Sequence, residues 1–218
     1  NCMALGDNLK TVGQRLTDNL VRCGYIGKWH LDGGDYFGLG RCPQGWDPAW
    51  WYDMKLYLDE LTPEQRLASR RVETMYDPGI DQGFTYGHRV ADRARRFLEA
   101  AGGEDFFLTV SFDEPHHPFL CPEPYASMYK GYRFPRKRNV RDTLAGKPEH
   151  QRTWAGDNVA KDRDAVEIGN AAYFGCNSFV DYEIGRVLEA VDRHCPDALV
   201  IYTSDHGSSF GSNGVGSK

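Results

Sequence analysis

The sequence predicts an α/β fold in which a mixed, mainly parallel sheet is flanked by helices. Two apolar runs, 106–112 and 198–202, each pass directly into polar residues, and a long helical pattern at 165–194 separates them. Near the start of the chain, a helical pattern is followed by a glycine and a short apolar segment. Because the carboxyl ends of parallel strands meet at one edge of a sheet, we expect functional side chains there.

Length and composition limit the class of protein. The 218 residues suffice for one sizeable α/β core, and their net charge of −5 argues against nucleic acid as the main partner. The apolar runs are too short to predict a membrane span. The six cysteines form no Cys-x-x-Cys pair, so neither a zinc site nor a cellular compartment can be predicted from them.

The first elements are a helix and a strand. Apolar residues recur at helical spacing over Asp7–Arg22, with Asp7 as the expected N-cap, and a strand is expected at Tyr25–Ile26. Lys28 and His30 then lie on the same side of an extended segment, with Trp29 on the other. A cation beside an imidazole can bind an oxyanion and move a proton, although a surface lysine and a structural histidine would give the same pattern.

The next stretch, 32–62, is rich in glycine, tryptophan and tyrosine. We interpret it as an aromatic loop that packs on the core. The alternative is a wall facing a substrate, because aromatic rings at the rim of a site stack on sugar or aryl groups. In that case Asp32, Asp35 and Tyr36 become candidate specificity contacts.

Three further helices are expected from the apolar periodicity. They cover Glu64–Arg71, Val90–Ala101 and Ala165–His194, and the last is expected to break near one of its glycines. His88, just before the second of these helices, is expected at the surface or as a helix cap.

The strand predicted at Phe106–Phe112 ends at Asp113 and leads into two histidines flanked by prolines. Proline keeps this backbone extended and stiff, which fixes where an imidazole points. We expect His116 in a site and His117 at its rim or in a structural role.

A basic segment follows at Tyr129–Arg141, with six lysine or arginine residues. Such a run is typical of a solvated loop. The alternative is an electrostatic funnel that attracts an anionic substrate and depends on salt.

The strand predicted at Ala198–Tyr202 leads into Asp205, His206 and Gly207. Adjacent side chains can reach one ion only where a strand breaks into a loop, and glycine permits that break. An oxygen donor next to an imidazole nitrogen suggests a divalent cation. The alternative is a turn in which Asp205 caps the following loop.

Three motifs, taken together, resemble the sulfatase family of the alkaline phosphatase superfamily. They are Gly-Lys-Trp-His-Leu at 27–31, Ser-Phe-Asp-Glu-Pro-His-His-Pro-Phe at 111–119, and Thr-Ser-Asp-His-Gly at 203–207 with a later Gly-Ser-Lys. The resemblance implies an alkaline-phosphatase-like fold and metal-dependent hydrolysis of a sulfate ester. Family members also carry a run similar to that of Asp181, Ile184, Gly185 and Arg186, which we interpret as packing residues.

The same resemblance assigns charged roles to four residues. Asp205 and His206 would bind a divalent cation, which is more usually Ca²⁺ in this family, although Mg²⁺ also fits. Lys28 and Lys218 would neutralise the sulfate group.

Proton transfer is assigned in the same way. His30 would act as a base near a hydrated formylglycine, while His116 and Lys218 would contact the leaving oxygen. The substrate would be an anionic sulfate ester, and glycan and aryl alcohols both remain open.

The sequence also departs from the family pattern. Sulfatases carry an early Asp-Asp pair and a Cys-x-Pro-Ser-Arg motif whose cysteine becomes formylglycine, and none of the six cysteines here stands in that motif. We therefore expect residues 1–218 to be a partial, incomplete catalytic domain without the amino-terminal strand, the nucleophile and the carboxyl-terminal subdomain. On this expectation the formylglycine belongs to the missing segment, and the 218 residues alone are inactive.

Three alternatives remain open. The parent protein could be a phosphonate esterase or a phosphate mono- or diesterase of the same superfamily, because the same cation, imidazole and ammonium groups serve either tetrahedral anion. It could be a noncatalytic module that binds an anion. It could also pair with a separate chain that supplies the nucleophile.

Overall fold

The structure is a computed structural model that divides into two compact units. The first unit contains residues 1–129 and 172–198, and the second contains residues 130–171 and 199–218. Each unit is described by itself below. The structure describes residues 4–6, 8–34, 36–135, 138–156, 167, 168 and 170–215.

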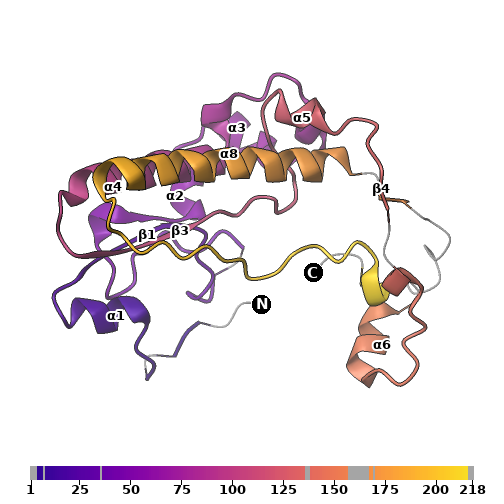
Figure 1. The fold of residues 1–218 in the computed structure, drawn as a ribbon, viewed down its shortest axis with the longest axis horizontal. Coiled ribbons are helices and arrows are strands. Elements are labelled where there is room, and N and C mark those ends of the chain that lie inside the picture. Colours follow the sequence, from indigo (N-terminus) through magenta and orange to yellow (C-terminus); the bar gives the residue numbers. More distant parts are fainter. Residues whose placement is uncertain are drawn as a thin grey trace. The chain divides into compact units, whose positions relative to one another are not determined.

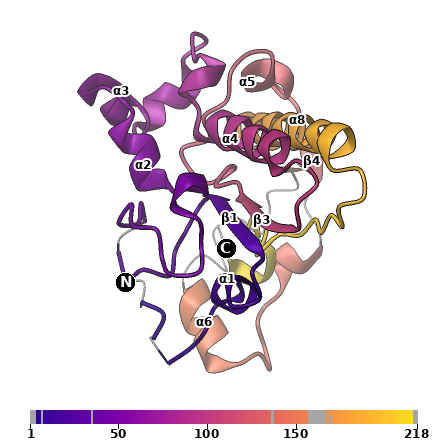
Figure 2. The same cartoon turned by 90° about the vertical axis from the view of Figure 1, so that its left-hand side faces the viewer.

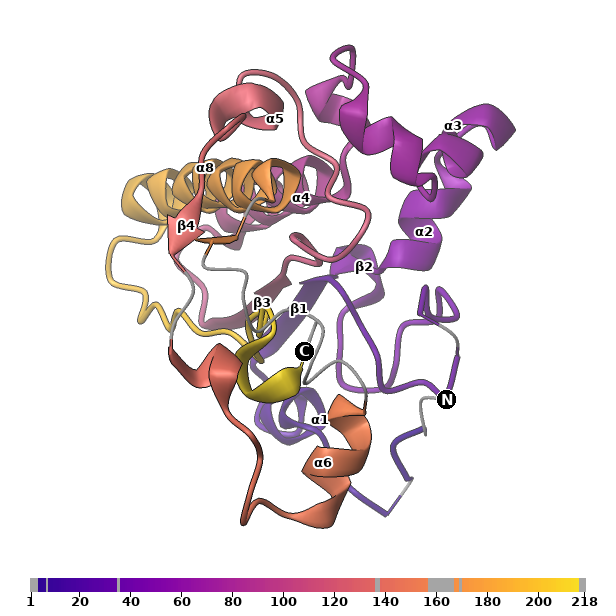
Figure 3. The same ribbon diagram turned by 90° about the vertical axis from the view of Figure 1, so that its right-hand side faces the viewer.

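The first unit is built on a three-stranded parallel sheet of order β2-β1-β3, of which β1 and β3 are labelled in Figure 1 and β2 in Figure 3. Its strands are β1 at Arg22–Gly27, β2 at Trp51–Tyr52 and β3 at Phe106–Ser111. β1 pairs in parallel with both neighbours, and its last residue, Gly27, lies opposite Ser111, the last residue of β3. The predicted parallel α/β architecture is confirmed, and so are the strands expected around 25–26 and 106–112.

Helices cover both faces of this sheet. α4 at Tyr86–Ala101 and α8 at Ala171–His194 lie side by side on one face, and α1 at Val12–Thr17 lies on the other (Figure 2). Gly24 in β1 permits the close packing of α4, because a Cβ there would lie 2.8 Å from the ring of Phe97. α8 runs without the break that its glycines were expected to cause.

The core of the first unit lies between the sheet and α4. Along α4, the buried side chains recur at helical spacing, as the pattern predicted: Val90, Ala91, Ala94, Phe97, Leu98 and Ala101. Ile26 of β1 and Val187 of α8 pack into the same cluster. These contacts fix the direction of β1, and therefore the position of the residues that follow it.

The first helix is shorter than predicted. α1 begins after Thr11, whose hydroxyl accepts from the backbone N–H of Gln14 while the side chain of Gln14 accepts from the N–H of Thr11. This capping box fixes the start of the helix. Asp7, the predicted cap, lies outside the described residues. Cys23 and Gly24, which directly follow the helix predicted over Asp7–Arg22, are residues of β1.

The aromatic stretch at 32–62 packs mainly on the core, as predicted. Trp46 and Trp51 are each 6% exposed and cluster with Trp29. The sequence did not predict β2 within this stretch, nor α2 at Met54–Asp59, which follows it (Figure 3). The remaining short elements of the first unit are α3 at Pro63–Ala68, α5 at Tyr125–Met128, and the 3₁₀ turns η1 at Pro48–Trp50, η2 at Val72–Tyr76 and η3 at Gln82–Phe84.

The second unit has little regular structure. It contains the antiparallel strands β4 at Phe134–Pro135 and β5 at Glu167–Ile168, the helix α6 at Glu149–Ala155, and the turns η4 at Arg138–Arg141 and η5 at Ser212–Gly214. Across the described parts of both units, none of the helices combines the length and apolar character that a bilayer span requires.

The strand predicted at 198–202 is not formed. Leu199, Ile201 and Tyr202 are 88%, 79% and 77% exposed, and no ladder includes them in the part of the chain that the structure describes. An apolar run becomes a strand only when a neighbouring strand pairs with its backbone. The crossover expected from β3 through α8 to a further strand is therefore not completed in this structure.

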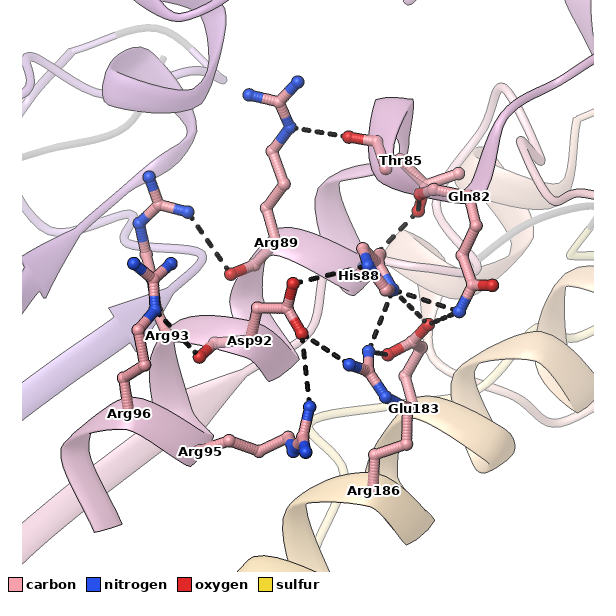
Figure 4. Close-up of polar contacts among 11 residues, drawn as sticks. Gln82, Thr85, His88, Arg89, Asp92, Arg93, Arg95, Arg96, Glu183 and Arg186 are labelled. Carbon is pink, nitrogen blue, oxygen red and sulfur yellow. Dashed lines mark hydrogen bonds and ion pairs between the residues drawn. The ribbon is translucent and has the colours of Figure 1, made fainter. Parts of the chain in front are cut away.

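A buried charged cluster joins α4 to α8 (Figure 4). Glu183 of α8 is fully buried, and its Oε1 accepts from Gln82 Nε2 at 2.7 Å and lies 2.8 Å from His88 Nδ1. Arg186 donates to both Glu183 and Asp92. The prediction that His88 is a surface or capping residue was therefore wrong, and Arg186 is an ion-pair partner as well as a packing residue.

Candidate active site

The candidate site begins where β1 and β3 end together. Gly27 has a φ of +126°, and a Cβ there would lie 1.9 Å from the carbonyl oxygen of Ser111. Only glycine fits this conformation and this approach. The N–H of Lys28 then donates to the same carbonyl at 2.8 Å. The segment after β1 is thus held directly against the end of β3.

The ammonium group of Lys28 is held from two sides. Its Nζ lies 2.9 Å from Oδ1 of Asp113 and 3.0 Å from the centre of the Tyr36 ring. The hydroxyl of Tyr36 donates to the other oxygen, Oδ2, of Asp113. The side chains of Lys28 and Asp113 are only 15% and 12% exposed, so water screens this ion pair weakly.

Tyr36 also contacts both predicted catalytic histidines. Its ring centre lies 4.5 Å from that of His116 in a tilted arrangement and 6.3 Å from that of His30 in an edge-on arrangement. Burial, together with the charge of Asp113, raises the pKa of the Tyr36 hydroxyl far above its usual value. Tyr36 therefore remains a proton donor to Asp113 throughout the neutral range.

The ring of His116 has a defined tautomer. Its Nδ1 lies 2.9 Å from the carbonyl oxygen of His117. Because a carbonyl oxygen can only accept, Nδ1 carries the proton, and Nε2 is the nitrogen that can exchange one. His117 itself is exposed, as expected for a rim residue, and its ring packs edge-on against Phe119.

Glu114 lies beside this group, at the amino end of α4. Its Oε1 accepts from the N–H of Gly87 at 2.6 Å, whereas its Oε2 is buried without a hydrogen-bond partner among the described residues. Burial, reinforced by the charge of Asp113, raises the pKa of Glu114 to about 7. A carboxyl group that ionises near neutral pH therefore lies next to the Lys28 ion pair.

The predicted metal ligands belong to the second unit. The Nε2 of His206 lies 3.2 Å from Oδ2 of Asp205, whose Oδ1 accepts from the N–H of His206 at 2.8 Å. Both side chains are exposed, at 83% for Asp205 and 46% for His206. One oxygen and one nitrogen donor on the same side of a loop fit the ligand chemistry of a divalent cation.

These two donors do not complete a metal site. A divalent cation of this kind takes roughly six or more ligands. Within the described residues, no group of three or more histidine, cysteine, aspartate or glutamate side chains is placed to hold an ion.

The other predicted site residues have different outcomes. Lys218 and Asp35 lie outside the described residues. Asp32 accepts from the N–H groups of Gly34 and Leu39 at 2.9 and 2.8 Å, so its carboxylate organises the loop that carries Tyr36.

Lys28, His30 and His116 therefore come together around Tyr36, in the first unit. Sequence reasoning missed Asp113 as the partner of Lys28. A signal for this contact was present, because Lys28 and Asp113 each closely follow the end of one of two parallel strands. Tyr36 was named as a candidate specificity contact, but no feature of the sequence predicted that its ring would lie against Lys28, His30 and His116.

Comparisons with known proteins identify the family. The family model described as Sulfatase matches residues 4–218. An uncharacterized sulfatase, YidJ, from Escherichia coli K12 is 42% identical over 225 residues, covering 100% of this chain and 45% of that protein. An arylsulfatase from Clostridium perfringens is 31% identical over 111 residues, covering 49% of this chain and 23% of that protein.

A solved structure supports the fold. The putative sulfatase yidJ from Bacteroides fragilis matches with a TM-score of 0.57 at 20% identity, covering 98% of this chain and 47% of that structure. The parallel sheet flanked by helices is consistent with the alkaline-phosphatase-like fold. This chain belongs to the sulfatase family of the alkaline phosphatase superfamily. It spans less than half the length of each of these relatives.

Proposed function

We propose that the protein containing this chain hydrolyses sulfate monoesters. The observation that carries the proposal is the convergence of Lys28, His30 and His116 around Tyr36, at the edge where β1 and β3 end. Ester hydrolysis at a tetrahedral anion needs positive charge near its oxygens and a proton for the departing alcohol. One ammonium and two imidazole groups supply both. Membership of the sulfatase family supports sulfate as the anion.

The roles of the first-unit residues follow from their chemistry. Lys28 neutralises the sulfate oxygens. His30 serves as a base, and His116 contacts the leaving oxygen, to which its Nε2 can deliver a proton because Nδ1 is committed to the carbonyl of His117. Removing one such contact typically raises the barrier by about 3 kcal/mol.

We propose that Asp205 and His206 contribute two ligands to a divalent cation, Ca²⁺ or alternatively Mg²⁺. Their adjacent oxygen and nitrogen donors support this assignment. When bound, such a cation would activate a nucleophile and attract sulfate oxygens. Lys218 is proposed as the second ammonium group.

The nucleophile is proposed to be a formylglycine outside these 218 residues, because none of the six cysteines is followed by the Pro-Ser-Arg pattern.

The substrate test compares two aryl esters. The protein containing this chain is expected to hydrolyse 4-nitrophenyl sulfate faster than an aryl phosphonate ester, with the rate of nitrophenol release as the measurement. Faster turnover of the phosphonate would replace the proposal with a phosphonate esterase. Turnover of neither ester, with retained anion binding, would favour a noncatalytic module.

The first specific prediction concerns Asp205. Asp205→Ala is expected to abolish Ca²⁺ binding measured by calorimetry and to lower kcat/KM for the aryl sulfate by about 100-fold or more, because one charged ligand is lost. Asp197→Ala is the matched control, since Asp197 is also an exposed aspartate and lies shortly before this segment. Metal binding and activity that survive in Asp205→Ala would contradict the assignment.

A further inference from the structure

The contacts of Lys28 suggest a role for the two residues that hold it. A lysine side chain loses up to about 2 kcal/mol of rotamer entropy when it is fixed. In this structure the protein itself fixes the Lys28 side chain, because Asp113 Oδ1 lies 2.9 Å from its ammonium group and the centre of the Tyr36 ring lies 3.0 Å from it. A positive charge held in place in advance is a common way to stabilise a transition state.

Asp113 is itself oriented by Tyr36. One carboxylate oxygen contacts Lys28, and the other accepts from the Tyr36 hydroxyl, so both oxygens are used. The ring of Tyr36 also lies against His30 and His116. The side chain of Tyr36 therefore sets the spacing of one ammonium group and two imidazole groups.

We propose that Tyr36 and Asp113 form a positioning pair that holds Lys28 for the transition state of the ester hydrolysis. This inference rests on the proposed function. Asp113 carries the same sign of charge as the substrate, so it opposes ground-state binding even while it places Lys28 correctly. We therefore expect the loss of Asp113 to lower kcat and to change KM little.

Kinetics of two variants test this inference. Asp113→Asn is expected to lower kcat by about tenfold or more, with KM for 4-nitrophenyl sulfate unchanged or lower, because a misplaced ammonium group still attracts the anion. Tyr36→Phe keeps the ring but removes the hydrogen bond to Asp113, so it is expected to lower kcat several-fold in the same way. If Asp113→Asn does not fold, Tyr36→Phe carries the test.

A double-mutant cycle separates positioning from a structural role. In a Lys28→Met background, Asp113→Asn is expected to change kcat/KM by less than about threefold, because Asp113 acts through Lys28. The proposal is wrong if Asp113→Asn lowers kcat/KM by the same factor in the Lys28→Met background as in the wild type. It is also wrong if Asp113→Asn raises KM at unchanged kcat.

A readout that needs no catalysis completes the test. Without substrate, acetylation of Lys28 by acetic anhydride, followed by mass spectrometry, is expected to become about fivefold faster in Asp113→Asn because the ion pair is lost. Lys55 provides the control, since it pairs with Asp59 on α2 and should react equally in all variants. Unchanged labelling of Lys28 would overturn the inference while the proposed function stands. If the wild-type protein hydrolyses neither ester, the proposed function fails, and with it the catalytic role of the pair, even if the labelling shows that Lys28 is held.

Discussion

Arg186→Met is expected to lower the free energy of unfolding by about 3–5 kcal/mol, because it leaves the carboxylate of Glu183 buried without its charged partner. Glu183 is 0% exposed, and Arg186 is the cation that links it to Asp92 across α4 and α8 (Figure 4). His88 and Gln82 also contact Glu183, yet neither carries the permanent charge of a guanidinium group. The loss therefore exceeds that of an ordinary surface ion pair.

Denaturant unfolding followed by circular dichroism measures this effect. Arg95→Met is the matched control, because Arg95 pairs with the same Asp92 at 3.6 Å but is 43% exposed, and its loss should cost less than about 1 kcal/mol. Adding Glu183→Met to Arg186→Met should recover part of the stability, since the buried charge is then removed. Equal effects of Arg186→Met and Arg95→Met would show that the burial of Glu183 adds nothing.

The elements that sequence reasoning predicted are those with a strong local pattern. The buried apolar stripe of α4 recurs at helical spacing, and β3 is a mainly apolar run whose residues are all partly buried, so each segment carries its own local signal. The same reasoning failed at 198–202, where the run is apolar but highly exposed. The local sequence pattern indicates which secondary structure a segment can form. Whether that structure forms depends on the neighbouring segments that pair or pack with it.

The candidate site was likewise predicted only in part. The common side of Lys28 and His30 followed from their spacing, and both side chains do contact Tyr36. The pairing of Lys28 with Asp113 joins residues 85 positions apart. No periodicity records such a contact, because it depends on which strands become neighbours.

The ionisation of Glu114 is expected to make the protein less stable as the pH rises. Its folded-state pKa of about 7 lies above the usual glutamate pKa of 4.5, so the folded state holds this proton more tightly than the unfolded state. The stabilisation is fully present below about pH 4.5 and is lost as the pH rises to about 7. A rise of the pKa from 4.5 to about 7 corresponds to roughly 3 kcal/mol of stability at low pH.

Glu114→Gln mimics the protonated carboxyl group and removes this dependence. The variant should match the wild type near pH 4.5 and be more stable by about 3 kcal/mol at pH 8, as measured by urea unfolding across this range. The amide oxygen can still accept from the N–H of Gly87, so the contact at the amino end of α4 is kept. Glu99→Gln is the control, because Glu99 is exposed on α4 and its replacement should leave the pH profile unchanged. If the Glu114→Gln and wild-type curves run parallel from pH 5 to 8, the burial of Glu114 does not raise its pKa, and the prediction is wrong.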